Sequence, residues 1–520
     1  MQIRTTFDFY FTFLEEFVCV ANGKLVDEQR NTARGLKTSH WRLDYPCPSY
    51  LCAFAVGELE LVPHEEVEGM PIAYLAVKGT PHKLLLDCFR ETPKMVRWLT
   101  TRLGAPFPFK NIKYYQIAVP IIRGAMECIS LVTWHDHFLF DEKLGLETRL
   151  LMDQVNIHEM AHSYFGDALV IRHFEHAWLK ESWATYVEAV WIQEQHGEDH
   201  FRYEMEAQAD MYISETTKKY VRPIVTREYN SSWNLFDQHL YPGGSWRLHM
   251  LRKILGDDVF WAAVSDYINQ FSEDLVETAD FRRCLEEISG LNLHKFFDQW
   301  IYGRGYPKLK GEYSFDLEKK EVKIVLEQDQ PEDWTTFDME IDVELSCDHD
   351  VVLTSKVVFD GQKRASTTLR LENRSKKPTM LRIDPHNLYL FTLELNPGED
   401  ILGKTLVHAK DINNRIWAGN ELIRIGSYSS YLKLEEAMLN EQFYGVRVKI
   451  ADKLGETNST LATRLLAKIV LREKDPMALQ QVGTWLLFFL SFFFSLSLFF
   501  PCFHCCWLLF FLSERVPLEG

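Results

Sequence analysis

The spacing of three metal-type ligands constrains the centre of this chain. His158 and His162 are four residues apart in the string HEMAH, and Glu181 follows 19 residues after His162. On a helix, residues four apart lie one turn apart on the same face, so both imidazoles can face one ion. Glu181 reaches that ion if a second helix returns antiparallel to the first. The spacing therefore predicts two packed helices, with the first ending near Gly166 and Asp167.

These three side chains form a known ligand combination for catalytic zinc. Such zinc ions usually have three protein ligands and leave one position for water, and two histidines with one glutamate are one such set. We therefore predict one zinc ion per chain, bound by His158, His162 and Glu181. A pair of ordinary surface histidines on a charged helix is the alternative interpretation.

The neighbouring polar residues have different expected roles. Glu159 points about 100° away from the preceding histidine, beside the metal, and is expected to act as the general base that takes a proton from the attacking water. Glu188 lies two turns beyond Glu181 and is a candidate to contact a ligand imidazole, although a solvent-exposed carboxylate is also possible there. We expect His173 and His176, in the connecting stretch, to be packing or surface residues.

Length and composition predict several domains with ordinary globular interiors. The chain has 520 residues, which is too many for a single core and suggests three or four domains. Hydrophobic residues make up 46% and charged residues 25%, as in soluble globular proteins. The net charge is −17 and no Lys/Arg-rich block occurs, which argues against a nucleic-acid partner.

Cysteine usage and the N-terminus indicate a cytoplasmic protein. Ten cysteines are spread along the chain without the spacing of a disulfide framework, which favours a reducing compartment. The first residues, MQIRTTFDFYFTFLEEF, lack the basic start and apolar core of a signal peptide.

The periodicity of apolar residues changes along the chain and predicts an α+β multidomain protein. Strand-like alternation marks the β regions, whereas long amphipathic stretches at 146–165, 178–196 and 245–270 mark helices. The sequence of residues 415–426 is weakly similar to that of residues 445–455, which suggests stacked helical repeats. The expected units are a partial N-terminal β-domain (1–62), a mostly helical domain (63–306), a β-sandwich (307–397), HEAT-like helical repeats (398–484) and an apolar tail (485–520).

The tail has two competing interpretations. From Trp485 to Leu512 it contains ten phenylalanines and no Asp, Glu, Lys or Arg, and it is long enough to span a bilayer. It is either a membrane anchor or translated non-coding sequence, because its residue types have pyrimidine-rich codons. A membrane contact is expected only if this tail is real. The CFHCC cluster at 502–506 supplies half of a zinc pattern and is assigned no metal.

Two motifs together resemble the gluzincin metallo-aminopeptidases. That family pairs His-Glu-x-x-His-(18 residues)-Glu with an upstream Gly-x-Met-Glu-Asn motif, which is GAMEC, Gly124 to Cys128, in this chain. The strings WLKESWATYVE (178–188) and LYPGGSWRLHMLR (240–252) also resemble family segments. The resemblance extends from about residue 15 to residue 480. It implies a β-saddle, a thermolysin-like catalytic domain, a β-sandwich and a helical C-terminal domain.

The resemblance also implies roles for residues outside the histidine segment. The segment Gly124, Ala125 and Met126 corresponds to an edge strand that lies along the substrate, and Glu127 to the glutamate that binds the free α-amine. A buried carboxylate left unpaired is costly, so a substrate without the ammonium group would be rejected. Tyr241 corresponds to the tyrosine that donates a hydrogen bond to the oxyanion.

The chain departs from the family pattern at three places. Cys128 replaces the asparagine after the glutamate, and Gly243 replaces a lysine two residues after the tyrosine. Only about 60 residues precede the catalytic domain, where the family has a complete β-domain, so the resemblance predicts an N-terminally truncated chain.

The leading hypothesis is a zinc aminopeptidase that acts on peptides with a free N-terminus, with Glu159 as general base and Tyr241 stabilising the oxyanion. Two alternatives remain open. One is a thermolysin-type zinc endopeptidase, and the other is a non-catalytic scaffold that retains the aminopeptidase fold.

Overall fold

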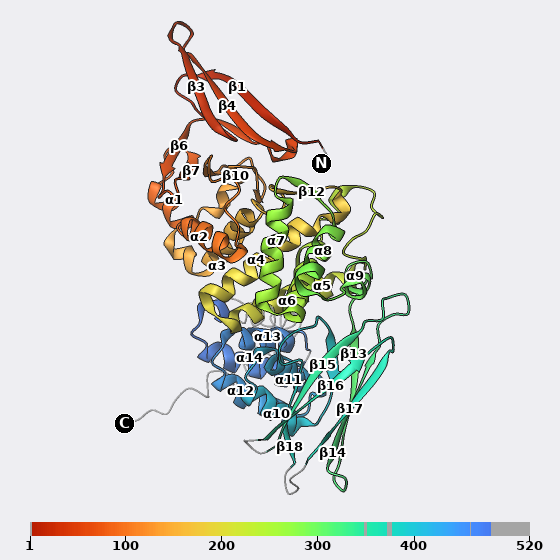
Figure 1. The fold of residues 1–520 in the computed structure, drawn as a ribbon. Coiled ribbons are helices and arrows are strands. Elements are labelled where there is room, and N and C mark those ends of the chain that lie inside the picture. Colours follow the sequence, from red (N-terminus) through yellow and green to blue (C-terminus); the bar gives the residue numbers. More distant parts are fainter. Residues whose placement is uncertain (1–2, 348–350, 372–376, 458, 480–520) are drawn as a thin grey trace, which may run out of the picture.

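The computed structural model describes residues 3–347, 351–371, 377–457 and 459–479 (Figure 1). The apolar tail and the CFHCC cluster lie outside these ranges. Among the described residues, no helix combines the length and apolar character needed to cross a membrane. Strands dominate the N-terminal part, helices the middle and the C-terminal part, in agreement with the expected α+β class.

A three-stranded antiparallel sheet projects from one end of the molecule (red in Figure 1). Its first strand carries phenylalanine at every second position from Phe7 to Phe13, and these rings lie on its less exposed face. This period-two pattern is why the segment forms a strand with two different faces. The sheet has the order β1 (Thr5–Leu14), β4 (Leu36–Cys47), β3 (Lys24–Asn31), and a separate pair joins β2 (Val18–Ala21) to β5 (Phe54–Gly57).

A mixed five-stranded sheet follows and places one functional segment at its edge. Its order is β6 (Leu59–Pro63), β7 (Ile72–Val77), β8 (Tyr114–Ala118), β10 (Leu131–Trp134), β9 (Ala125–Met126). Strands β7, β8 and β10 run parallel, and β9 pairs antiparallel with β10 at the outside. Helices α1 (His82–Cys88) and α2 (Thr92–Leu103) lie between β7 and β8 in the chain.

Helices form the middle of the molecule, close to where the apolar periodicity predicts them. The predicted stretch 178–196 is one helix, but 245–270 is divided at Gly256, whose φ of 77° interrupts the helix. The first metal-site helix ends at residue 161, earlier than expected. These helices are α3 (Glu142–Ala161), α4 (Trp178–His196), α5 (Glu198–Lys218), α6 (Gly244–Leu255), α7 (Asp257–Phe271), α8 (Thr278–Ser289) and α9 (His294–Trp300), and a short parallel pair joins β11 (Leu169–Ile171) to β12 (Asp274–Val276).

The C-terminal half contains two sheets and a group of helices, teal and blue in Figure 1. Helix α10 (Glu399–His408) packs on α11 (Ile412–Ile425) and on α12 (Tyr428–Asn440), and α11 also packs on α13 (Tyr444–Gly455). One sheet has the order β17 (Arg364–Arg370), β14 (Glu321–Gln328), β13 (Lys308–Asp316), β19 (Thr392–Leu395), and the other β16 (Val351–Phe359), β15 (Met339–Cys347), β18 (Pro378–Ile383). The helices are α10 (Glu399–His408), α11 (Ile412–Ile425), α12 (Tyr428–Asn440), α13 (Tyr444–Gly455) and α14 (Thr460–Arg472).

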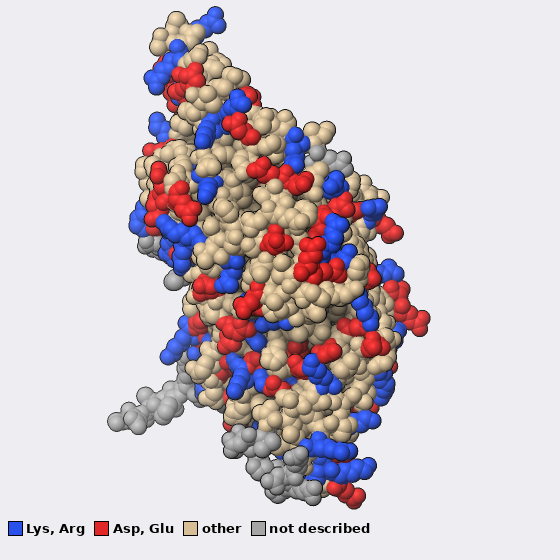
Figure 2. Space-filling view, viewed as in Figure 1, with Lys and Arg blue, Asp and Glu red and all other residues tan. Residues whose placement is uncertain are grey.

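The surface carries mixed charge on the face shown in Figure 2. Lys and Arg side chains alternate with Asp and Glu side chains over the helical middle and the C-terminal sheets. Long-range steering of a ligand by one sign of charge needs a continuous field of that sign, which this face does not present.

Helix α4 is buried along most of its length and anchors the helical core. Trp183 is fully buried, and its ring stacks on Phe165 with centroids 4.4 Å apart and on Phe260 at 5.8 Å. Phe165 follows the first metal-site helix, so this stack fixes the distance between α3 and α4. The core therefore determines how the two ligand-bearing helices approach each other.

We expect Trp183→Ala to lower the free energy of unfolding by about 3–5 kcal/mol, because it removes a large buried ring and leaves a cavity. The control is Trp233→Ala, whose side chain is 79% exposed and which should change stability by less than about 0.5 kcal/mol. Urea denaturation of the two variants measures both values. Equal stability of the two variants would contradict the role of this stack.

Candidate metal centre and active site

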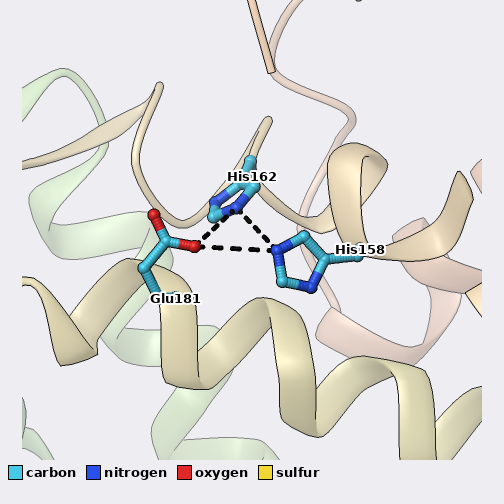
Figure 3. A group of neighbouring side chains, drawn as sticks. All are labelled: His158, His162 and Glu181. Carbon is cyan, nitrogen blue, oxygen red and sulfur yellow. Dashed lines mark hydrogen bonds and ion pairs between the residues drawn. The ribbon is translucent and has the colours of Figure 1, made fainter. Parts of the chain in front are cut away.

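Three predicted ligands converge in the structure. His158 Nε2 and His162 Nε2 lie 3.2 Å apart, and Glu181 Oε2 lies 3.6 Å from the first and 3.3 Å from the second (Figure 3). His158 is on α3, His162 is in the turn that follows it, and Glu181 is in the first turn of α4. Although α3 ends at residue 161, the His162 amide still donates to the carbonyl of His158 at 3.3 Å, which preserves the helical spacing.

The other nitrogen of each imidazole is held by its own partner. His158 Nδ1 lies 2.6 Å from Glu188 Oε1, and His162 Nδ1 lies 2.9 Å from the carbonyl oxygen of Phe165. A partner on Nδ1 fixes the ring orientation and the tautomer, so that Nε2 presents its lone pair to a metal. Glu188 thus contacts the imidazole of His158, which is one of the two alternatives that the sequence left open.

This donor set fits a metal ion. Two imidazole nitrogens and one carboxylate oxygen point to a common position, and the three donor atoms lie within 4.8 Å of one another. His176 is hydrogen-bonded instead to Thr278 Oγ1 at 2.9 Å, and neither it nor His173 belongs to this group of donors. Three ligands of these types leave room for a further oxygen ligand, which is the pattern of a catalytic site.

Glu159 lies beside the candidate ligands, and among the described residues it forms no ion pair. Its side chain is buried, and within the described part of the chain its Oε2 atom makes no hydrogen bond. Burial is the main cause that raises the pKa of Glu159 to about 7, against the lowering effect of His158. A carboxylate with this pKa can take up and release a proton near neutral pH.

Tyr241 reaches the same region from a different part of the chain. It lies in a π-helical turn (His239–Gly243) that leads into α6, and its ring centroid is 6.1 Å from that of His158. Burial, and then Glu181, raise the pKa of Tyr241 well above its usual value, so the hydroxyl keeps its proton. Tyr241 is therefore a hydrogen-bond donor beside the metal ligands.

A second group of metal-type side chains supports this turn rather than offering open ligands. Asp237 Oδ1 accepts a hydrogen bond from Arg222 at 2.6 Å, and Glu215 Oε2 lies 3.1 Å from His239 Nδ1. The amide of Leu240 also donates to Asp237 at 2.9 Å. Because these carboxylates already have partners, the group holds the π-helical turn in place.

The GAMEC motif lies at the edge of the five-stranded sheet. Ala125 and Met126 form β9, which pairs with β10 on one side and is the outermost strand. Gly124 precedes β9 with a φ of 70°, in the region that favours glycine. Glu127 follows the strand and is buried, with its side chain directed toward the start of α4.

Glu127 has an unexpected partner in the structure. Lys180 Nζ lies 2.6 Å from Glu127 Oε1 and 3.0 Å from Glu181 Oε1. Burial acts to lower the pKa of Lys180, but Glu127 and Glu181 outweigh it and raise this pKa well above its usual value. Burial acts to raise the pKa of Glu127, but Lys180 and His162 hold it below its usual value. Both groups are thus charged.

Lys180 was not among the residues predicted from the sequence. A signal was present, because the chain has Trp-Leu-Lys-Glu where the resembling family has Trp-Leu-Asn-Glu, and this places a lysine next to the ligand Glu181. What the pattern could not show is that Glu127, 53 residues away, approaches this lysine.

The departures from the family pattern at Cys128 and Gly243 have local explanations. Cys128 is buried, and its amide donates to the carbonyl of Met126 at 2.9 Å in a tight turn after β9. At Gly243, a Cβ atom would come within 2.9 Å of the Tyr212 ring and 3.1 Å of the carbonyl oxygen of Gln238. Glycine therefore lets the turn that carries Tyr241 pack closely against α5.

Comparison with known proteins gives a family match to the region that holds these residues. The model described as "Peptidase family M1 domain" matches residues 88–300. Aminopeptidase 2 of Candida albicans (strain SC5314) is 26% identical over 325 residues, which cover 60% of this chain and 33% of that protein. Aminopeptidase M1-A of Oryza sativa subsp. japonica is 28% identical over 332 residues, covering 61% of this chain and 35% of that protein.

The chain spans about a third of the length of the curated relatives it matches. A solved structure, that of Legionella pneumophila aminopeptidase A in complex with aspartic acid, has a TM-score of 0.76 and 16% sequence identity to this chain. The structural match covers 93% of this chain and 62% of the Legionella pneumophila chain, which shows that the two chains share a fold.

The matched residues contain the converging ligands together with Glu127, Glu159 and Tyr241. Residues 88–300 thus match the domain of peptidase family M1, and the candidate metal centre lies inside the matched region.

Proposed function

We propose that this chain is a zinc-dependent aminopeptidase that hydrolyses the N-terminal peptide bond of peptides. One observation carries the proposal: two imidazole nitrogens and a carboxylate oxygen converge beside Glu159, a buried carboxylate whose Oε2 has no hydrogen-bond partner in the described part of the chain. The family domain and the aminopeptidases among the similar proteins support it.

His158, His162 and Glu181 are the residues that would hold the metal. Zinc bound by these side chains supplies Lewis-acid chemistry, which acidifies water and polarises a carbonyl group. Glu188 and the Phe165 carbonyl keep the two imidazoles oriented, because each contacts the Nδ1 atom that faces away from the common position. The chain thus presents preorganised ligands.

Glu159 is proposed as the general base. Its unpartnered oxygen can accept a proton from the attacking water, and the same carboxyl group can then give that proton to the leaving amine. The raised pKa suits both transfers, because a group with a pKa near the working pH is an effective acid as well as an effective base.

Tyr241 is proposed to stabilise the charge that develops on the carbonyl oxygen. Its hydroxyl is protonated and lies in a buried setting, where a hydrogen bond to an oxyanion is stronger than in water. The network of Asp237, Arg222 and Glu215 holds the turn that carries this tyrosine, so the donor is positioned before the substrate arrives.

The edge strand β9 is proposed to hold the substrate backbone. Gly124, Ala125, Met126 and Glu127 present an outer strand edge, to which an extended peptide can add by main-chain hydrogen bonds. The peptide would then run along the metal centre with its N-terminal end near Glu127, which limits hydrolysis to the first peptide bond.

The position of cleavage tests this proposal against an endopeptidase. A peptide of about ten residues, incubated with the zinc-loaded chain, should lose residues one at a time from its N-terminus, as followed by mass spectrometry. A chelator should abolish the reaction and added zinc should restore it, with one zinc per chain by metal analysis. Internal fragments would indicate an endopeptidase, whereas an intact peptide with zinc bound would indicate a scaffold.

Replacing the base should separate catalysis from metal binding. We expect Glu159→Gln to lower kcat by about 10²–10⁴-fold, because the amide cannot accept the proton, while the zinc content is unchanged. The matched control is Glu194→Gln, whose side chain lies on the exposed part of α4 and pairs with Arg102. A Glu159→Gln chain that keeps its rate would remove Glu159 from the mechanism.

Replacing the oxyanion donor should affect the transition state more than substrate binding. We expect Tyr241→Phe to lower kcat by about 10²–10³-fold with little change in KM. Tyr428→Phe is the control, because that side chain is 67% exposed and lies on α12. An increase in KM without a change in kcat would show that Tyr241 binds the ground state instead.

A further inference from the structure

Two cysteines flank a tight turn outside the residues assigned to the reaction. Cys47 is the last residue of β4, and Cys52 directly follows the short turn Ser49–Leu51. The Cys52 amide donates to the carbonyl of Ser49 at 3.2 Å, which closes the turn. Both cysteine side chains therefore pack into the same apolar cluster of the core.

The side chains of this pair contact each other. Both thiols are free, and they are hydrogen-bonded to one another. Cys47 is fully buried, whereas Cys52 is only partly buried. A disulfide needs two Cβ atoms about 4 Å apart, and thiols that already contact each other are close to this arrangement. The turn thus holds two thiols in a position from which a disulfide can form.

The hydrogen bond gives the two thiols different chemical properties. The Cys47 thiol lowers the pKa of Cys52, against burial, which acts to raise it. The same hydrogen bond, together with burial, raises the pKa of Cys47 well above its usual value. Since the thiolate is the nucleophile in thiol–disulfide exchange, the partly exposed Cys52 is suited to attack a disulfide while Cys47 keeps its proton.

Two other cysteines of the N-terminal part lack this combination. Cys19 is also partly buried, but burial raises its pKa to about 11. Cys128, the last residue of the GAMEC motif, is buried, and this burial raises its pKa well above its usual value. Both thiols are therefore poor nucleophiles near neutral pH. Cys52 differs from them in having partial exposure, a lowered pKa and a hydrogen-bonded thiol together.

The turn between the two cysteines is held on two sides. Asn22 Nδ2 donates to the carbonyl of Leu51 at 3.2 Å, and the Asn22 amide donates to the carbonyl of Ala53 at the same distance. The ring of Tyr50, inside the turn, has its centroid 5.5 Å from Lys180 Nζ. The cysteine pair is thus fixed between the N-terminal strands and the candidate metal centre.

We propose that Cys47 and Cys52 form a redox-active dithiol that reacts with low-molecular-weight disulfides such as oxidised glutathione. The Cys52 thiolate first attacks one sulfur of the small disulfide, which forms a mixed disulfide and releases one thiolate. Cys47 then loses its proton and attacks the Cys52 sulfur, which forms the Cys47–Cys52 disulfide and releases a second thiolate. The pair is oxidised by two electrons, and its two protons end on the two released thiols.

The first step prepares the second. The hydrogen bond to Cys52 is the first cause that raises the pKa of Cys47, and the mixed disulfide no longer has the Cys52 thiolate that holds this proton. Cys47 therefore becomes easier to deprotonate once Cys52 has reacted. The reaction uses neither the metal ligands nor Glu159, so this inference does not depend on the proposed peptidase function.

Peptide mass mapping tests the proposal. Trypsin cleaves after Arg42 and Lys78 and releases residues 43–78, which contain Cys47 and Cys52 and no other cysteine. The full chain is incubated with oxidised glutathione at neutral pH, its remaining thiols are alkylated, and the chain is digested. We expect residues 43–78 to lose two hydrogen atoms and to carry no alkyl group, and dithiothreitol should reverse this change. A peptide alkylated at both cysteines would overturn the proposal.

Two variants identify the attacking cysteine. Cys47→Ser should stop at the mixed disulfide, so that residues 43–78 carry one glutathione. Cys52→Ser should remain unmodified, because Cys47 is buried and protonated. An adduct in Cys52→Ser but not in Cys47→Ser would overturn the proposed order of attack. If a variant does not fold, the mass of residues 43–78 from the unaltered chain still decides whether the dithiol is oxidised.

Cys19 is a matched control within the same chain. Trypsin releases it in residues 5–24, which contain no other cysteine. In the Cys47→Ser chain, Cys19 should gain glutathione at least about tenfold more slowly than Cys52, because its raised pKa leaves little thiolate at neutral pH. A time course of the two peptide masses measures both rates. Equal rates would show that exposure alone governs the reaction, which would overturn the role of the hydrogen-bonded pair.

Discussion

The ion pairs of Lys180 set the electrostatic conditions for the whole site. Four carboxylates, those of Glu127, Glu159, Asp167 and Glu181, are buried in this region. Leaving buried charges without partners is costly, and Lys180 compensates the two that it contacts. Burial is the first cause acting on all four pKa values, and it prevails for Glu159 and Asp167, whereas Lys180 and the histidines reverse it for Glu127 and Glu181. Lys180 and the histidines together therefore lower the pKa values of Glu127 and Glu181, whereas burial leaves those of Glu159 and Asp167 raised.

The rigid part of the fold places these charges. Helices α3 and α4 pack directly on each other, and the Trp183 ring stacks on Phe165 just after the histidines. A hydrogen bond from α4 also holds the turn that bears Tyr241, because the Ser182 hydroxyl donates to the carbonyl of Leu240 at 2.6 Å. Packing and hydrogen bonding thus bring together residues from β9, α3, α4 and the π-helical turn, and no single segment contains the complete site.

Much of this arrangement could be predicted from spacing alone. The four-residue step between His158 and His162 is a property of a helix, and the extent of α4 follows from its periodicity, with both ends as predicted. Local backbone conformation was harder to predict, since the break at Gly256 and the π-helical turn depend on tertiary contacts. The Lys180–Glu127 pair was missed for the same reason, because it joins an edge strand to a helix distant in sequence. In the C-terminal part, two weak repeats were visible in the sequence, where the described residues form the helices α10 to α14.

The two carboxylate oxygen atoms of Glu181 face different groups. Oε2 faces the imidazoles of His158 and His162, and Oε1 faces the ammonium group of Lys180. A ligand that moves Lys180 changes the charge felt by this carboxylate and so changes the affinity for the metal. Thermodynamic linkage then requires the metal to change the affinity for that ligand by the same factor. In the proposed aminopeptidase, binding of the metal and binding of a ligand beside Lys180 would be coupled through this one carboxylate group.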